Sequence, residues 1–211
     1  MKHLRMRIIG AVQPLYPAIV VILLLGSGSS AFAHPHVFIE NRLAVVFDSE
    51  GLAGIEATWV FDEFFSNMIA VDYDRNQNGK LEPGEVATVK EKAFDNLINF
   101  DYFTFIRING RPFKVQYIRD FSAILSDGRL IYRFMIPCHV KGGASFKEIT
   151  IAQYDPSYYT AIAFPKDRPI GFQGEEDFEI HYDIAANREE AYYYDQIHPV
   201  EVRMRFRQKD G

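Results

Sequence analysis

Residues 36–61 read HVFIENRLAVVFDSEGLAGIEATWVF, and this stretch decides the fold class. Apolar and polar residues alternate on both sides of the segment Asp48-Ser49-Glu50-Gly51, whose residue types favour a turn. Alternation with a period of two is typical of strands that bury one face. The stretch therefore predicts an antiparallel hairpin with one face in a hydrophobic core.

The alternating pattern returns from Tyr102 to the C-terminal end. Asn109-Gly110 and Asp127-Gly128 each separate two alternating segments, and both dipeptides favour tight hairpin turns. An aromatic fraction of 15% suits a β-rich core. We therefore expect a mainly β chain with a β-sandwich-like body. Its later strands are expected in FKEITIAQYD, YYTAIAFP, FEIHYDI and PVEVRMRFR.

Between these two β-rich parts the apolar period changes to that of a helix. Residues 61–74 place apolar side chains at helical spacing, and residues 82–100 do so again after a loop rich in glycine and asparagine. Asp62 and Glu63 stand near the start of the first pattern, where the helix dipole favours acidic side chains. Residues 60–101 are therefore expected to form a helix–loop–helix inserted after the second strand.

The loop between the two helical patterns, residues 74–85, reads DRNQNGKLEPGE and fits the twelve-residue EF-hand calcium loop at every position. Gly79 allows the sharp bend, and Leu81 occupies the apolar position. The loop has three carboxylates, so we expect weak binding and a structural role for calcium, with an ion-free turn as the alternative. The predicted ligands are the side chains of Asp74, Asn76, Asn78, Glu82 and Glu85 and the backbone carbonyl of Lys80.

Residues 1–33 have the order of a cleavable secretory signal peptide, with an uncleaved N-terminal anchor as the alternative. Basic residues come first, and the short apolar run AIVVILLLG and an Ala31-x-Ala33 triplet follow. The run is too short to span a bilayer, which takes about 20 residues. Residues 34–211 are then expected to form a single periplasmic domain that begins at His34 and spans no membrane.

Without residues 1–33 the chain keeps 20 basic against 28 acidic residues, a net charge of −8. This balance argues against nucleic acid as a partner and favours cations. The chain contains no HExxH motif, nucleophile elbow or glycine-rich phosphate loop, so we expect no enzymatic activity. The one cysteine, Cys138, excludes an internal disulfide and is expected to be a buried apolar filler, with a ligand or an intermolecular bridge as alternatives.

The first mature residues, His34-Pro35-His36, suggest a second metal site. After cleavage His34 would present its α-amine and imidazole together as a brace, and His36 would add another imidazole from the same face of a strand. Nitrogen ligands suit zinc, nickel, cobalt or copper. Asp155 or His181 would be a further ligand. The alternative is a frayed terminus at His34 with His36 on an edge strand. His181 has the alternative of an ordinary strand or loop histidine, and His139 and His198 are expected to be such residues.

The chain resembles an uncharacterised bacterial periplasmic family labelled as the periplasmic component of an ABC-type uncharacterised transport system. The resemblance covers residues 34–164 and is carried, in order, by AFAHPHVFIE, TWVFDEFFSNMI, DRNQNGKLEPGE, NFDYFTFIRING and YDPSYYTAIAF. Members are commonly encoded beside permeases of the nickel/cobalt type, and some are implicated in zinc transport. The resemblance implies a periplasmic accessory to transition-metal transport whose partner is an inner-membrane metal permease.

These observations lead to one expected function and two alternatives. The expected function is a periplasmic, non-enzymatic protein that binds zinc, nickel or cobalt for a transport system and also holds a structural calcium ion. The first alternative is a copper carrier or copper oxidase with an N-terminal histidine brace. The second is a calcium-stabilised interaction module that uses the aromatic residues near YDPSYY.

Overall fold

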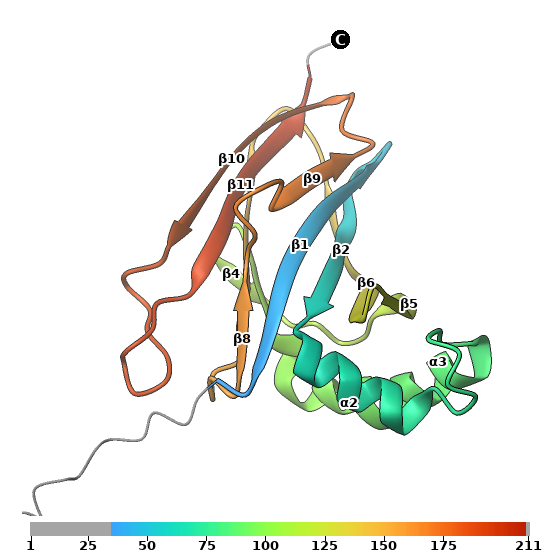
Figure 1. The fold of residues 1–211 in the computed structure, drawn as a ribbon. Helices are drawn as coiled ribbons and strands as arrows, with labels where there is room; N and C mark the ends of the chain where they lie inside the picture. The colour runs from blue at the N-terminus through green and yellow to red at the C-terminus, as the bar shows by residue number, and fades with distance from the viewer. Residues whose placement is uncertain (1–34, 210–211) are drawn as a thin grey trace, which may run out of the picture. The chain divides into compact units, whose positions relative to one another are not determined.

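The computed structural model describes residues 35–209, which form two β-sheets and a helical insertion (Figure 1). The predicted signal peptide and His34 lie outside the described residues. The mainly β fold predicted from the alternating segments is confirmed, and the hairpin that opens the described chain turns at the expected residues, 48–51.

The first sheet has six strands in the order β5-β6-β2-β1-β8, and β9 also pairs with β1. β1 and β2, β2 and β6, and β6 and β5 pair in antiparallel fashion. On its other edge β1 pairs in parallel with β8 and, further along its length, with β9. The strands are β1 Val37–Asp48, β2 Gly51–Phe61, β5 Arg119–Ser126, β6 Arg129–Lys141, β8 Thr160–Ala163 and β9 Ile170–Gln173.

The second sheet has five antiparallel strands in the order β10-β11-β7-β3-β4. Both predicted short hairpins are present: Asn109-Gly110 joins β3 to β4, and Asp127-Gly128 joins β5 to β6 in the first sheet. The strands are β3 Thr104–Ile108, β4 Arg111–Phe113, β7 Lys147–Gln153, β10 Phe178–Ala186 and β11 Val200–Gln208.

The two sheets share one hydrophobic core, and the alternation of each strand supplies it. On β11, Val202, Met204 and Phe206 are almost fully buried, while the residues between them face outward. Phe206 meets Phe47 of β1 edge-on, with ring centroids 5.1 Å apart. Burying one such side chain contributes about 1.5–3 kcal/mol. This packing agrees with the sandwich-like body that the sequence predicts.

The helical insertion follows β2, as predicted, and its first helix is α2, Glu63–Tyr73. Asp62 caps the helix, because its carboxylate accepts a hydrogen bond from the Phe65 backbone N–H at 2.9 Å. Ser66 joins the helix to β6 by accepting the Leu130 N–H at 2.8 Å. The predicted apolar face is only partly buried: Ile69 is in the core, but Phe64 is 79% exposed.

The second helix is shorter than predicted. The expected helical pattern over residues 82–100 becomes α3, Pro83–Val89, then a π-helical turn, Lys90–Phe94, and then 3-10 turns, Asp95–Phe103. The irregular backbone serves the core, since it places Phe94 fully buried against the ring of Phe134 at 5.1 Å. Figure 1 shows α2 and α3 together beyond the end of β2.

Candidate metal centre

The predicted calcium loop, residues 74–85, connects α2 to α3 and is organised by its own side chains. The two carboxylate oxygens of Asp74 accept the backbone N–H groups of Asn78 at 3.1 Å and Gly79 at 2.8 Å. Asn76 Oδ1 accepts the Asn78 N–H at 3.0 Å, and Asn78 Oδ1 accepts the Lys80 N–H at 2.8 Å. Residues at every second position therefore turn their oxygens onto one tight backbone turn, which Gly79 permits with a φ of +77°.

The two glutamates at the end of the loop reach back to it. Glu85 accepts the backbone N–H of Arg75 at 2.9 Å and that of Glu82 at 3.0 Å, so its carboxylate ties the start of the loop to the start of α3. Glu82 Oε1 accepts the side-chain amides of Asn78 and, at 3.2 Å, Asn76. Hydrogen bonds within the loop thus link all five side chains predicted to bind calcium, Asp74, Asn76, Asn78, Glu82 and Glu85.

Glu82 is the least satisfied member of this loop. Its Oε2 is buried and has no hydrogen-bond partner among residues 35–209. The hydrogen bond with Glu85, followed by those with Asn78 and Asn76, lowers the pKa of Glu82 to about 2. The side chain is therefore anionic near neutral pH, and one of its oxygens is left without a donor.

The two cationic side chains of the loop do not neutralise its carboxylates. Arg75 and Lys80 are exposed, and neither forms an ion pair with any residue that the structure describes. Within residues 35–209 no three His, Cys, Asp or Glu side chains are gathered as a metal-binding group. Of the six calcium ligands predicted in the loop, however, two are asparagines and one is a backbone carbonyl, so carboxylates alone do not define this set.

The second predicted metal site can be followed only from His36 onward. His36 lies in an exposed bend before β1 begins at Val37, so the prediction that it is a strand residue is wrong. His34 lies outside the described residues, so the joint binding of one metal ion by the two histidines stays a prediction. The backbone still fixes its position, because the His36 N–H donates to the carbonyl of Tyr159 at 2.9 Å. The His36 and Tyr159 rings lie 4.9 Å apart.

Neither Asp155 nor His181, the two residues suggested as a further ligand, is available to bind a metal ion together with His36. Asp155 is 5% exposed, and its carboxylate accepts the N–H groups of Ser157 at 2.8 Å and Thr160 at 3.0 Å. His181 lies on β10 in the other sheet and contacts Glu179 at 2.9 Å. Asp155 therefore organises a turn, and His181 is hydrogen-bonded to Glu179 on the surface.

The remaining singled-out residues lie apart from both predicted metal sites. His198 contacts the carbonyl of Glu190 at 2.7 Å, and His139 is within 3.7 Å of Glu50 on an exposed face. Cys138 faces the core and is 1% exposed, whereas its strand neighbour His139 points outward. Burial raises the pKa of the Cys138 thiol to about 12, so the prediction of a buried apolar filler is confirmed.

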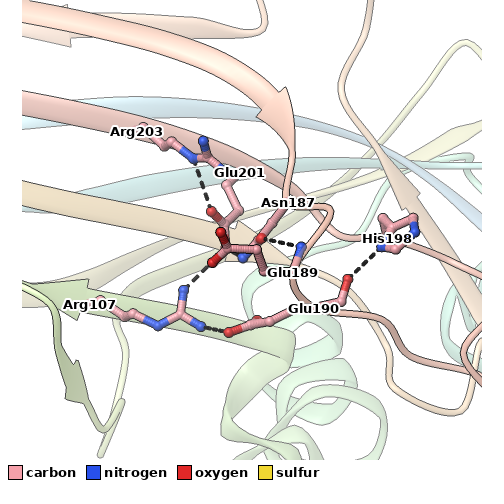
Figure 2. Close-up of polar contacts among 7 residues, drawn as sticks. All are labelled: Arg107, Asn187, Glu189, Glu190, His198, Glu201 and Arg203. Atoms are coloured by element: carbon pink, nitrogen blue, oxygen red, sulfur yellow. Dashed lines mark hydrogen bonds and ion pairs between the residues drawn. The ribbon is translucent and has the colours of Figure 1, made fainter.

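A polar cluster that the sequence did not indicate surrounds Glu201 (Figure 2). Glu201 is 3% exposed, and its carboxylate contacts the guanidinium groups of Arg107 at 3.2 Å and Arg203 at 3.3 Å. Asn187 donates to the same carboxylate at 2.9 Å, and Arg107 also pairs with Glu190. The only sequence signal is the alternation of β11, which places Glu201 and Arg203 on one face; the partners come from β3 and from the segment after β10.

Comparison with known proteins shows to which family the chain belongs. Residues 19–208 match the family described as "Protein of unknown function (DUF1007)". An "Uncharacterized 15.5 kDa protein in trpE 3'region" of Spirochaeta aurantia is 29% identical over 131 residues, which are 62% of this chain and 93% of that protein. An "Uncharacterized protein" of Haemophilus influenzae is 26% identical over 155 residues, 71% of this chain and 73% of that one. None of these descriptions names an activity.

One further finding concerns membranes. No helix within residues 35–209 combines the length and the apolar character needed to cross a bilayer.

Proposed function

The chain belongs to the DUF1007 family, and for this member we propose a metal-binding function in which calcium stabilises the inserted helix–loop–helix. The hydrogen-bond pattern of the 74–85 loop is the observation that carries the proposal. Asp74, Asn76 and Asn78 each turn an oxygen onto the backbone of one tight turn, and Glu85 joins the two ends of the loop. The oxygens come from alternate positions of the loop, as the first ligands of an EF-hand loop do.

The orphaned oxygen of Glu82 fits a hard cation. A buried carboxylate oxygen without a donor costs free energy, which a nearby positive charge would offset. Calcium accepts six to eight oxygen ligands and would supply that charge. The residues that would hold it are Asp74, Asn76, Asn78, Glu82 and Glu85, with the carbonyl of Lys80.

The ion would act as a structural staple. α2 and α3 pack on the core through Ile69 and Val89, and Leu81 is the loop side chain that packs against it. Most of the other loop residues are exposed. A cation bound by both ends of the loop would hold the two helices together. No reaction is assigned to the loop, and the proposed role is non-enzymatic.

Calcium-dependent stability tests this part of the proposal. At a calcium concentration ten times the dissociation constant, a single site adds about 1.4 kcal/mol to the free energy of unfolding. For a chain of this size the melting temperature should then rise by about 3–6 °C. Glu85→Gln removes one ligand charge and should abolish the rise.

Glu91→Gln is the matched control for this experiment. Glu91 is an exposed glutamate in the same insertion and is paired with Lys92 rather than with a loop residue, so the same loss of charge should leave the calcium effect intact. No rise in the wild-type protein at millimolar calcium would contradict the calcium site.

A second candidate function is the capture of zinc, nickel or cobalt by the N-terminal histidines for an inner-membrane permease. The supporting observation is the position of His36, which is exposed while its backbone is anchored to Tyr159. If processing frees the amine of His34, that residue and His36 would chelate one ion; copper carriage is the variant of the same idea. The predicted periplasmic location supports this candidate, because cleavage would create the amine.

Calorimetry with zinc and nickel tests the second candidate. His34→Ala, or one extra residue before His34, should each weaken zinc or nickel binding strongly and leave calcium binding unchanged. The α-amine and imidazole have ordinary pKa values of about 7.7–8.0 and 6.5, so binding should fall steeply below about pH 6. Equal affinity in the wild-type protein and both variants would remove the N-terminal site.

A further inference from the structure

β10 forms one edge of the second sheet, and it is the longest edge strand among residues 35–209. It pairs with β11 along its whole length without a register shift, and Figure 1 shows it on the outside of β11. A long and regular edge strand presents a row of backbone N–H and C=O groups with which another chain can pair.

The other sheet edges in the described part of the chain are less suited to pairing. β4 has three residues and includes Pro112, and β8 and β9 have four residues each. β5 has a register shift between Arg119 and Ser122. Short strands, prolines and bulges all hinder the addition of a further strand. β10 has none of these features.

The hydrogen bonds at the two ends of the β10–β11 ladder show which backbone groups of β10 face outward. The Lys209 N–H donates to the Asp177 carbonyl at 2.9 Å, and the Asn187 N–H donates to the Pro199 carbonyl at 2.8 Å. Both bonds continue the register of the ladder, in which hydrogen-bonded pairs recur at every second residue. The odd-numbered residues of β10 therefore bond to β11, and the backbone groups of the even-numbered residues point to the open edge.

Most of these outward groups have no partner. The Phe178 N–H donates to the Glu175 carbonyl at 2.9 Å, but within residues 35–209 no hydrogen bond is made by the outward N–H and C=O groups of Ile180, Tyr182 and Ile184. None of these three residues is buried. The middle of β10 is therefore accessible to a strand from outside.

The sequence of β10 is complementary to itself in an antiparallel arrangement. When Tyr182 stands opposite Tyr182 of a second copy, Ile180 stands opposite Ile184, and His181 stands opposite Asp183. The even-numbered residues form the hydrogen-bonded pairs of this arrangement, so the histidine and the aspartate form non-hydrogen-bonded pairs, in which side chains approach most closely. Opposite charges at such positions favour pairing.

The charges also select this register over its neighbours. Centring the pair on His181 would place histidine opposite histidine and Glu179 opposite Asp183. Centring it on Asp183 would place two carboxylates opposite each other. Like charges directly opposite are destabilising, so the arrangement centred on Tyr182 is favoured.

The two charged side chains are available for these contacts. His181 is half-exposed, and its bond to Glu179 uses Nε2, which leaves Nδ1 for the second copy. Asp183 is exposed and forms no ion pair within residues 35–209. Arg203 stands opposite Asp183 on β11, but its guanidinium contacts Glu201 at 3.3 Å.

The other face of β10 would gain apolar contacts. Ile180 and Ile184 are half-buried at the margin of the core, and Tyr182 is 51% exposed although its ring lies 5.2 Å from that of Phe172. In the self-paired arrangement each isoleucine meets an isoleucine of the second copy and the two tyrosines are neighbours. Apolar and aromatic cross-strand pairs of this kind stabilise sheets.

We propose that β10 is a homodimerisation edge, at which two copies of this chain pair antiparallel about Tyr182. The second sheets of the two copies then form one continuous sheet. The pair Tyr182–Tyr182 and the two Ile180–Ile184 pairs each exchange two backbone hydrogen bonds, and two His181–Asp183 pairs set the register.

Sedimentation velocity over a concentration series tests the proposal on the full chain. The interface is small, so the wild-type protein should form a dimer with a dissociation constant on the order of 10 µM. A wild-type protein that remains monomeric at concentrations well above this value would overturn the proposal.

Two charge variants and their mixture locate the interface. His181→Asp places carboxylates opposite each other, and Asp183→Lys places an ammonium group opposite the histidine, so each variant alone should dimerise about tenfold more weakly than the wild type. An equimolar mixture should restore dimerisation, because the new aspartate then faces the new lysine.

Glu91→Lys is the control for these variants, since it makes the same change of charge at an exposed position of the helical insertion and should leave the dimer unchanged. Positions 181 and 183 are exposed, so both variants should fold, which their melting curves check. Wild-type dimerisation in both variants, or a mixture no stronger than either variant alone, would overturn the proposed pairing.

Amide hydrogen exchange gives an independent test at single residues. Above the dissociation constant the N–H groups of Ile180, Tyr182 and Ile184 should become protected, whereas those of His181 and Asp183 should be protected at every concentration because they bond to β11. A dimer in which the three even-numbered amides stay unprotected would use a different surface and would overturn the proposal.

Discussion

Carboxylates are held in two different ways in the two polar regions of this molecule. In the 74–85 loop, Asp74, Glu82 and Glu85 are bound by backbone N–H groups and amides from the same twelve residues. Around Glu201, the carboxylate is bound by Arg203 of the same strand, by Asn187 from the segment after β10 and by Arg107 of β3 in the same sheet. The loop is largely exposed, and Glu201 is almost fully buried.

The difference lies in where the positive charge comes from. Glu201 has protein cations, and it needs them because an isolated buried carboxylate would be very unfavourable. The loop has three carboxylates, and none of them forms an ion pair within residues 35–209, which is tolerable near water but leaves the negative charges to repel one another. The charge of Glu201 is therefore already balanced by protein groups, whereas the 74–85 loop would be stabilised by an added cation.

The largest expected effect is the loss of Glu201. Glu201→Ala should lower the free energy of unfolding by about 3 kcal/mol, at the lower end for a broken buried pair because the freed arginines are partly exposed and can reach water. Urea unfolding measures it, with and without calcium, and the loss should be the same in both.

Glu179→Ala is the control on the same sheet. Glu179 pairs with Arg207 and His181, but its side chain is 36% exposed, so its removal should cost about 0–1 kcal/mol. Similar losses in the two variants would contradict the view that burial makes the Glu201 cluster essential.

A smaller effect is expected when the loop gains a carboxylate. Asn76→Asp adds a fourth negative charge to the proposed ligand set and should tighten calcium binding by about fivefold, the equivalent of roughly 1 kcal/mol. Without calcium the same change should lower the melting temperature. Asn96→Asp is the control: it adds a charge at an exposed position of the same insertion and should change neither calcium binding nor the melting temperature. If the Asn76→Asp protein is more stable than the wild type in the absence of calcium, the charge argument is refuted.

The smallest effect concerns pH. Because the pKa of Glu82 is lowered to about 2 in the folded protein, its ionised form favours folding. This contribution is fully present above the ordinary pKa of 4.5 and is lost as the pH falls from there towards 2. Wild-type protein should lose more stability than Glu82→Gln over that interval in urea unfolding; parallel curves for the two proteins would show that Glu82 does not contribute.

The hairpins were predictable because their signals are local. Asn109-Gly110 and Asp127-Gly128 permit the positive φ values that both turns adopt, and alternation on each side sets which face is buried. Asp62 likewise marks the start of α2 in the sequence itself. The end of the second helix was not predictable, since it follows from the fit of Phe94 against Phe134, a residue of β6.

Pairing between distant strands was also beyond the sequence pattern. β9 is four residues long and was not expected, and the parallel pairing of β8 and β9 with β1 depends on the path of the connections. The strand argument for His36 failed for a related reason: alternation shows which residues suit a strand, but the partner strand decides where it begins.

The sequence by itself determined the β-rich class, the hairpin turns, the inserted helices and the composition of the 74–85 loop, because each depends on residues close together in the chain. Only the tertiary structure decided the surroundings of Glu201 and the burial of Asn41. Each is a polar side chain that looks ordinary in its own strand; Glu201 is paired with Arg107 of β3, which lies far away in the sequence, and Asn41 is almost fully buried in a sheet. Burial is the physical reason: it is a property of the packed molecule, and it turns an unremarkable carboxylate or amide into a group that must find a partner.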